Sequence, residues 1–170
     1  MFSAVIDAPT AEEEKLQRLA GLDFSLVKRK LMLPEPEGKN WSQEQADEAE
    51  EWYRRFLHVI IKYPDACQHV PNGPIDAFWH QHILDTEAYA RDCEYVLGSF
   101  LHHYPYFGLN GDAAERDEAF DITNRLYRQE FGEDCTQMRR HRREMSAQGF
   151  TCNSGGGTGC GQRGCGGGSR

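Results

Sequence analysis

The residues between positions 76 and 103 concentrate the side chains of this sequence that are suited to metal or acid–base chemistry. This stretch holds four of the seven histidines, together with Cys93 and several aspartates. Imidazole nitrogen, thiolate sulfur and carboxylate oxygen are the usual protein ligands of zinc, iron and copper. The segment therefore predicts a site for one of these metals, and its candidate ligands are Asp76, His80, His82, Cys93 and His103.

The spacing of these residues limits which of them can share one ion. His80 and His82 are two positions apart, so on a regular helix they point about 200° away from each other. Asp76 lies four positions before His80 and shares its helical face. His82 and Asp85 are three apart and share a different face. Either pair can supply two ligands, or one ligand and the carboxylate that orients its imidazole.

The cluster supports two functional interpretations. In the first, the domain binds a metal through the Trp-His-x-His segment, and if it is catalytic the metal activates water or dioxygen, with Tyr89 and Asp85 as candidate catalytic residues. In the second, the histidines, aspartates and cysteine form a structural core network in a non-catalytic interaction module. Its protein partner would then bind the aromatic region formed by Tyr104, Tyr106 and Phe107.

The remaining cysteines give weaker signals. Cys67 and His69 place a thiol near a base, but residues so close in the chain rarely aim at each other, and no third group is evident to orient the imidazole. We therefore expect this pair not to act together. The tail cysteines Cys152, Cys160 and Cys165 have spacings that match no zinc motif, so we expect a flexible tail there.

The elements that must position the cluster are expected to be helices. Apolar residues recur at intervals of three and four, whereas alternating patterns bounded by turn residues are nearly absent. Ser42 and Gln45 form a capping-box signal for a helix that runs to Pro64. The sequence thus predicts an all-α fold, a compact bundle of five or six helices.

The helices around the cluster follow from local signals. One helix is expected to begin near Pro74, whose missing N–H costs nothing in a first turn, and to break at Asp85. A second helix is expected to run through Leu101, so that His102 and His103 lie at its end. A last amphipathic helix is expected over residues 117–131.

The chain divides into three parts by composition. Residues 1–20 are expected to form an acidic N-terminal helix and residues 21–148 a helical domain. Residues 149–170 form a Gly/Cys-rich tail, which cannot bury enough apolar surface to offset its backbone entropy and is expected to be disordered.

Charge and hydropathy indicate the environment and exclude some partners. The net charge of −8 argues against binding to nucleic acid or to anionic membranes. No segment approaches the roughly 18 apolar residues of a membrane span, and no secretion signal is evident. We therefore expect a cytoplasmic protein with reduced thiols and without a membrane partner.

The motif resembles a known family. The pattern Asp76-x-x-Trp79-His80-x-His82-x-Leu84 is similar to the glycine-rich domain-containing-protein-like family. The resemblance covers roughly residues 20–131, and it extends to the positions Tyr63-Pro64, Pro71, Tyr89, Cys93, Gly98 and His103-x-Pro105. It implies a helical domain and a shared set of motif residues, which strengthens the metal interpretation, but it implies no particular reaction.

Overall fold

A computed structural model describes residues 8–138 of the chain. Within this range the fold consists of six α-helices and one short 3₁₀ helix, and no residue in it forms a strand. The predicted all-α bundle is therefore confirmed, whereas the predicted disorder of residues 149–170 falls outside the described residues. The elements are α1 (Ala11–Ala20), α2 (Ser25–Met32), α3 (Gln43–Lys62), α4 (Gly73–Leu84), α5 (Thr86–Leu97), α6 (Ala113–Phe131) and η1 (Cys135–Gln137).

Side-chain caps set the starts of the longer helices. Ser42 caps α3, and its hydroxyl accepts the N–H of Gln45 while the Gln45 side chain accepts the N–H of Ser42. This reciprocal pair is the predicted capping box, and Thr10 and Glu13 form a second one at α1. Asn72 caps α4, the helix that carries the histidine motif.

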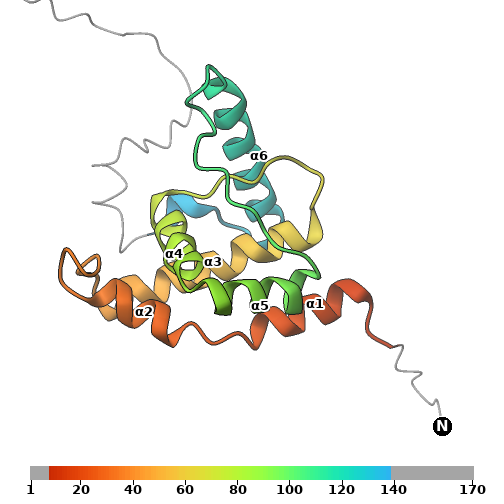
Figure 1. The fold of residues 1–170 in the computed structure, drawn as a ribbon. Coiled ribbons are helices and arrows are strands. Elements are labelled where there is room, and N and C mark those ends of the chain that lie inside the picture. The colour runs from red at the N-terminus through yellow and green to blue at the C-terminus, as the bar shows by residue number, and fades with distance from the viewer. Residues whose placement is uncertain (1–7, 139–170) are drawn as a thin grey trace, which may run out of the picture.

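Helix α3 is the centre of the bundle, since it contacts α1, α2, α4 and α6. In Figure 1, α1, α2 and α5 lie along one side of the molecule and α6 stands on the opposite side. The core is rich in aromatic rings that pack edge to face, which favours specific ring orientations. Its largest fully buried side chains include Tyr53, Tyr89, Tyr127, Phe24, Phe56 and Phe78.

The chain bends between α4 and α5, as predicted, because Asp85 ends one helix and caps the next. The predicted end of the second helix was wrong. Helix α5 ends at Leu97, and Gly98 caps it by adopting a left-handed conformation with φ +79° and donating its N–H to the Glu94 carbonyl. Only glycine enters this conformation without steric cost, so the helix stops there and His103 lies in the following loop.

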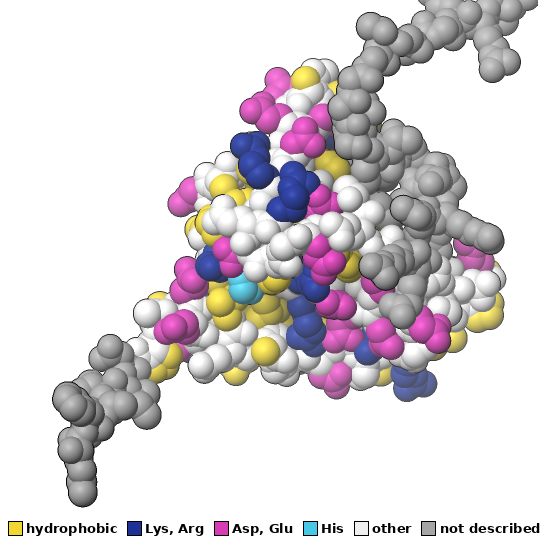
Figure 2. Space-filling model, turned by 180° about the vertical axis from the view of Figure 1, so that it is seen from behind, with side chains coloured by type: hydrophobic (Ala, Val, Ile, Leu, Met, Phe, Trp, Pro, Cys, Tyr) yellow, Lys and Arg dark blue, Asp and Glu magenta, His cyan; other side chains and the backbone are white. Residues whose placement is uncertain are grey.

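The surface mixes charges of both signs. On the face shown in Figure 2, basic and acidic side chains are interspersed, and hydrophobic side chains gather around the histidine drawn in cyan. Among the described residues, no helix combines the length and the apolar character needed to cross a membrane.

A carboxylate joins α3 to α6. Glu130 of α6 accepts hydrogen bonds from Nζ of Lys62 at 2.7 Å and from the hydroxyl of Tyr63 at 2.6 Å. The imidazole of His58 lies 3.2 Å from the same carboxylate. Burial raises the pKa of Glu130, but these hydrogen bonds lower it more strongly, to about 2.

We expect acid to weaken this connection. The pKa of Glu130 in the folded chain lies below its ordinary value of 4.5. The carboxylate therefore stabilises the fold fully above about pH 5, and this contribution is lost as the pH falls toward 2. Denaturant unfolding between about pH 7 and pH 3 should show a smaller loss of stability for Glu130→Gln than for the wild type. Equal losses of stability in Glu130→Gln and in the wild type would contradict the stabilising role of the Glu130 carboxylate.

Candidate metal centre

Helix α4 presents Asp76 and His80 on one face. Asn72 accepts the N–H of Ile75 and starts the helix, and Pro74 lies in its first turn. Asp76 then lies in the first turn, with His80 one turn later. The four-residue spacing brings Nε2 of His80 within 3.7 Å of Oδ1 of Asp76.

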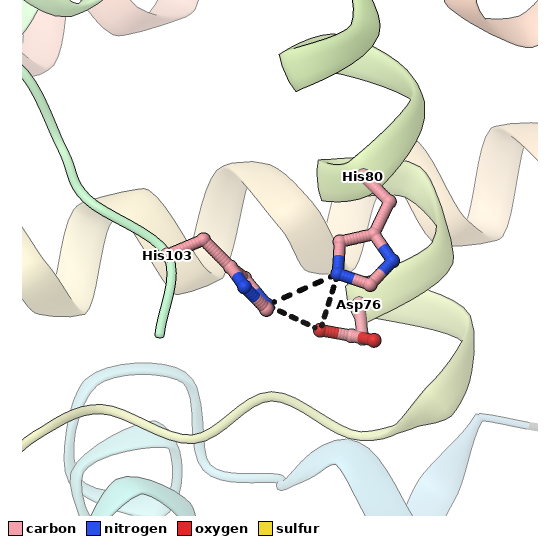
Figure 3. A group of neighbouring side chains, drawn as sticks. All are labelled: Asp76, His80 and His103. Atoms are coloured by element: carbon pink, nitrogen blue, oxygen red, sulfur yellow. Dashed lines mark hydrogen bonds and ion pairs between the residues drawn. The ribbon is translucent and has the colours of Figure 1, made fainter. Parts of the chain in front are cut away.

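His103 meets this pair from the loop that follows α5. Its Nε2 lies 3.0 Å from Oδ1 of Asp76 and 3.1 Å from Nε2 of His80. Figure 3 shows the three side chains converging from two segments of the chain. One carboxylate oxygen and two imidazole nitrogens thus form a triangle of atoms that could ligate a metal ion. Without an ion, Nε2 of His103 carries a proton and donates it to the Asp76 carboxylate, and a bound metal ion would replace this proton.

The size of the triangle matches a metal coordination shell. With metal–ligand bonds of about 2.1 Å, neighbouring ligands lie about 3.4 Å apart in a tetrahedral site and about 3.0 Å apart in an octahedral one. The three observed separations are 3.0, 3.1 and 3.7 Å. These donors can therefore bind one ion with little movement of the side chains.

The triangle lies in the wall of a cavity of about 370 Å³. The side chain of His103 is 16% exposed, whereas that of Asp76 is 35% and that of His80 is 49% exposed. An ion bound by all three would thus keep coordination positions on its accessible side. The other residues that line the cavity include the apolar side chains of Ile60, Trp79, Leu101 and Phe107.

A buried hydrogen-bond chain holds the loop that carries His103. Nε1 of Trp79 donates to the hydroxyl of Tyr89 at 2.8 Å, and this hydroxyl donates to the Leu101 carbonyl at 2.6 Å. The indole of Trp79 also packs against the His103 ring, with 4.6 Å between the ring centroids. Tyr89 therefore acts in this structure as an anchor for the histidine loop.

We expect Tyr89→Phe to weaken metal binding by about ten-fold, because outer partners of a ligand typically change affinity by 10- to 100-fold. The change removes the anchor of the loop and leaves the buried indole N–H of Trp79 without its acceptor. Titration with Zn²⁺ measures the affinity. Tyr95→Phe is the matched control, since Tyr95 lies on the same helix and is 54% exposed. Equal affinities of the two variants would contradict the anchoring role.

His82 lies apart from the triangle, in the core, where its side chain is 4% exposed. Its Nε2 lies 3.2 Å from a carboxylate oxygen of Asp92, and its Nδ1 lies 3.1 Å from the hydroxyl of Tyr53. A carboxylate only accepts, so Nε2 carries the proton and Nδ1 accepts from Tyr53. Burial lowers the pKa of His82 despite the opposing effect of Asp92, and the ring is neutral. Both ring nitrogens therefore have protein partners.

The other residues named from the sequence occupy different positions. Cys93 is buried in the core and has no disulfide partner. Asp85 caps α5 by accepting the N–H of Ala88. Tyr104 and Tyr106 are exposed, with 5.8 Å between their ring centroids. The structure thus brings Asp76, His80 and His103 together and places His82 and Cys93 elsewhere.

Sequence reasoning missed two partners of His82. Tyr53 lies on α3 and Asp92 on α5, so neither is close to His82 in the chain. Asp92 follows His82 by ten residues, beyond the break at Asp85, where helical spacing no longer applies. A buried tyrosine in the apolar stripe of α3 carries no signal that its hydroxyl meets a histidine.

The comparisons with known proteins give a family and no activity. A family model described as UCP032817-like matches residues 22–146 of the chain, and that family is uncharacterised. The match does not carry the glycine-rich domain-containing name, so that resemblance stays a prediction. No curated protein and no solved structure matches the chain.

Proposed function

We propose that this chain, which belongs to the UCP032817-like family, binds a single divalent transition-metal ion through Asp76, His80 and His103. The observation that carries this proposal is the convergence of three potential ligand atoms, 3.0 to 3.7 Å apart, at the edge of a cavity. Helix α4 supplies two of the ligands, and the Tyr89 anchor positions the third.

The donor set favours zinc or iron(II). Two histidines and one carboxylate, with further positions open, are typical of non-haem iron(II) sites, and three protein ligands with an open position are typical of catalytic zinc. Copper(I) prefers thiolate or thioether sulfur, and the triangle contains none. When bound, such an ion supplies Lewis acidity, and zinc also lowers the pKa of a bound water.

The cavity limits what can approach the ion. Apolar side chains dominate its wall beside the triangle, and its volume of about 370 Å³ suits a small organic molecule. The indole of Trp79 packs beside His103 and excludes water from that side of the site. We therefore infer that the ligand of the metal centre is a small molecule with an apolar portion and an oxygen or nitrogen donor.

Metal binding by the purified, untagged protein tests this function. Equilibrium dialysis against Zn²⁺, or against Fe²⁺ without oxygen, followed by plasma mass spectrometry, should find one ion per chain. Asp76→Asn should weaken binding at least about ten-fold, because the variant loses the anionic ligand. Asp85→Asn is the matched control, since asparagine caps a helix as well as aspartate does. Binding that is unchanged in Asp76→Asn would contradict the proposal.

The interaction module remains the second candidate, supported by the exposed aromatic side chains of Tyr104 and Tyr106. Rigid aromatic residues at a surface favour protein interfaces. In that case the triangle would hold only a shared proton. Dialysis would then find no metal above the level of an Asp76→Asn/His80→Ala double variant.

A further inference from the structure

A thiol and an imidazole face each other on the cavity wall, in the loop between α3 and α4. Sγ of Cys67 lies 3.7 Å from Nδ1 of His69. The sulfur also packs against α6, 3.8 Å from the Ala119 carbonyl oxygen and 3.8 Å from Oγ1 of Thr123. The expectation that these two residues would not aim at each other was wrong, because the loop turns both side chains inward.

The backbone of Tyr63 determines which nitrogen of His69 is the base. Nε2 lies 2.8 Å from the Tyr63 carbonyl oxygen. A carbonyl only accepts, so Nε2 carries the proton and donates it to this oxygen. Burial lowers the pKa of His69, so the ring is neutral at pH 7 and Nδ1 holds a lone pair near the thiol. The carbonyl is thus the orienting group that the sequence did not reveal.

The surroundings of Cys67 make this base necessary. Burial raises the pKa of the Cys67 thiol, so the thiol is protonated at neutral pH. A protonated thiol is a weak nucleophile unless a neighbouring base takes its proton. Thr123 is not that base, because its hydroxyl donates to the Ala119 carbonyl at 2.8 Å and accepts the N–H of Val70 at 3.2 Å.

We propose that Cys67 and His69 form a nucleophile–base pair that accepts an acyl group from an ester bound in the cavity. Sγ forms a bond to the carbonyl carbon of the ester, and the thiol proton passes to Nδ1 of His69. The ester C–O bond then breaks, and His69 returns the proton to the departing oxygen. The products are an alcohol and a thioester on Cys67, and nothing is oxidised or reduced. This chemistry needs no metal and is independent of the proposed metal binding.

The cavity fits such a substrate. Cys67 and His69 line it together with the apolar side chains of Ile60, Trp79 and Phe107, which can contact an acyl chain. The other titratable side chains that line it are Asp76, His80, His102, His103, Tyr104 and Arg116. Arg116 lies on α6 and is paired with Asp117.

Acetylation by p-nitrophenyl acetate tests the pair. The full chain is treated in the presence of a chelator, and acetylated peptides are quantified over time by mass spectrometry, which separates Cys67 from every other cysteine. Cys67 should acetylate at least about 100-fold faster in the wild type than in His69→Gln, the lower end of what general-base assistance supplies. His102→Gln is the matched control, because it makes the same change at another histidine of the cavity, and it should leave the rate unchanged.

The opposite results would overturn the proposal. These are an unchanged rate in His69→Gln, or a Cys67 rate no higher than that of buried Cys93. If His69→Gln fails to fold, the pH profile of the wild type decides. Assistance by His69 predicts a rate that rises with pH at acidic pH and is constant above about pH 7, because the base is already deprotonated there, given its lowered pKa. An unassisted thiol would instead react about ten-fold faster with each pH unit through pH 9.

Discussion

Replacing His103 with alanine should abolish stoichiometric metal binding and leave the fold intact. His103 is one of the three proposed ligands, and its Nε2 lies 3.0 Å from Asp76 and 3.1 Å from His80. Without it, two ligands from one helix remain, so we expect the affinity for Zn²⁺ to fall at least about 100-fold. The loop itself stays anchored through the Tyr89 hydroxyl and the Leu101 carbonyl. Zinc titration measures the affinity, and circular dichroism checks the helicity.

His102→Ala is the matched control for this change. His102 is the neighbouring residue, has the same side chain and also lines the cavity, but it does not belong to the triangle. We expect it to keep the wild-type affinity. Equal losses in the two variants would show that the histidine loop contributes general charge or structure, and they would contradict the assignment of His103 as a ligand.

Replacing His82 with alanine should have the reverse effect, a large loss of stability with metal binding retained. The variant leaves a cavity among the rings of Phe24, Tyr53 and Tyr89, and it removes one of the partners of the Asp92 carboxylate. Cavity formation and the loss of two buried hydrogen bonds together cost about 3 kcal/mol of the free energy of unfolding. Denaturant unfolding in the presence of a chelator measures this change.

Leu84→Ala serves as the control for His82→Ala. Leu84 lies on the same helix two residues later and is 73% exposed, so its truncation should change the stability by less than about 0.5 kcal/mol. A His82→Ala variant that keeps its stability but loses its metal would contradict the structural role of His82, and it would move the metal centre to the other face of α4.

The sequence predicted most helices correctly because their signals are local. The capping box at Ser42 and the break at Asp85 are each carried by side chains within a few residues of the helix end. The end of α5 was misjudged because apolar spacing continues at Phe100 and Leu101 beyond Gly98. The glycine was itself a stop signal, since a helix commonly ends at a glycine that adopts positive φ.

The candidate site was predictable only within one helix. The four-residue spacing of Asp76 and His80 places both on one face of α4, as the structure shows. The approach of His103 depends on how the loop after α5 returns across α4, and the burial of His82 depends on packing against Phe24 and Tyr53. These are tertiary contacts, which helical periodicity does not predict. The pairing of Cys67 with His69 likewise depends on a loop conformation.

A crystal structure of the protein soaked with Zn²⁺, with anomalous data collected at the zinc absorption edge, tests the central claim most directly. We predict a single strong anomalous peak about 2.1 Å from Oδ1 of Asp76 and from Nε2 of both His80 and His103. An empty triangle in crystals that bind zinc elsewhere, for example at Cys67 and His69, would contradict the claim.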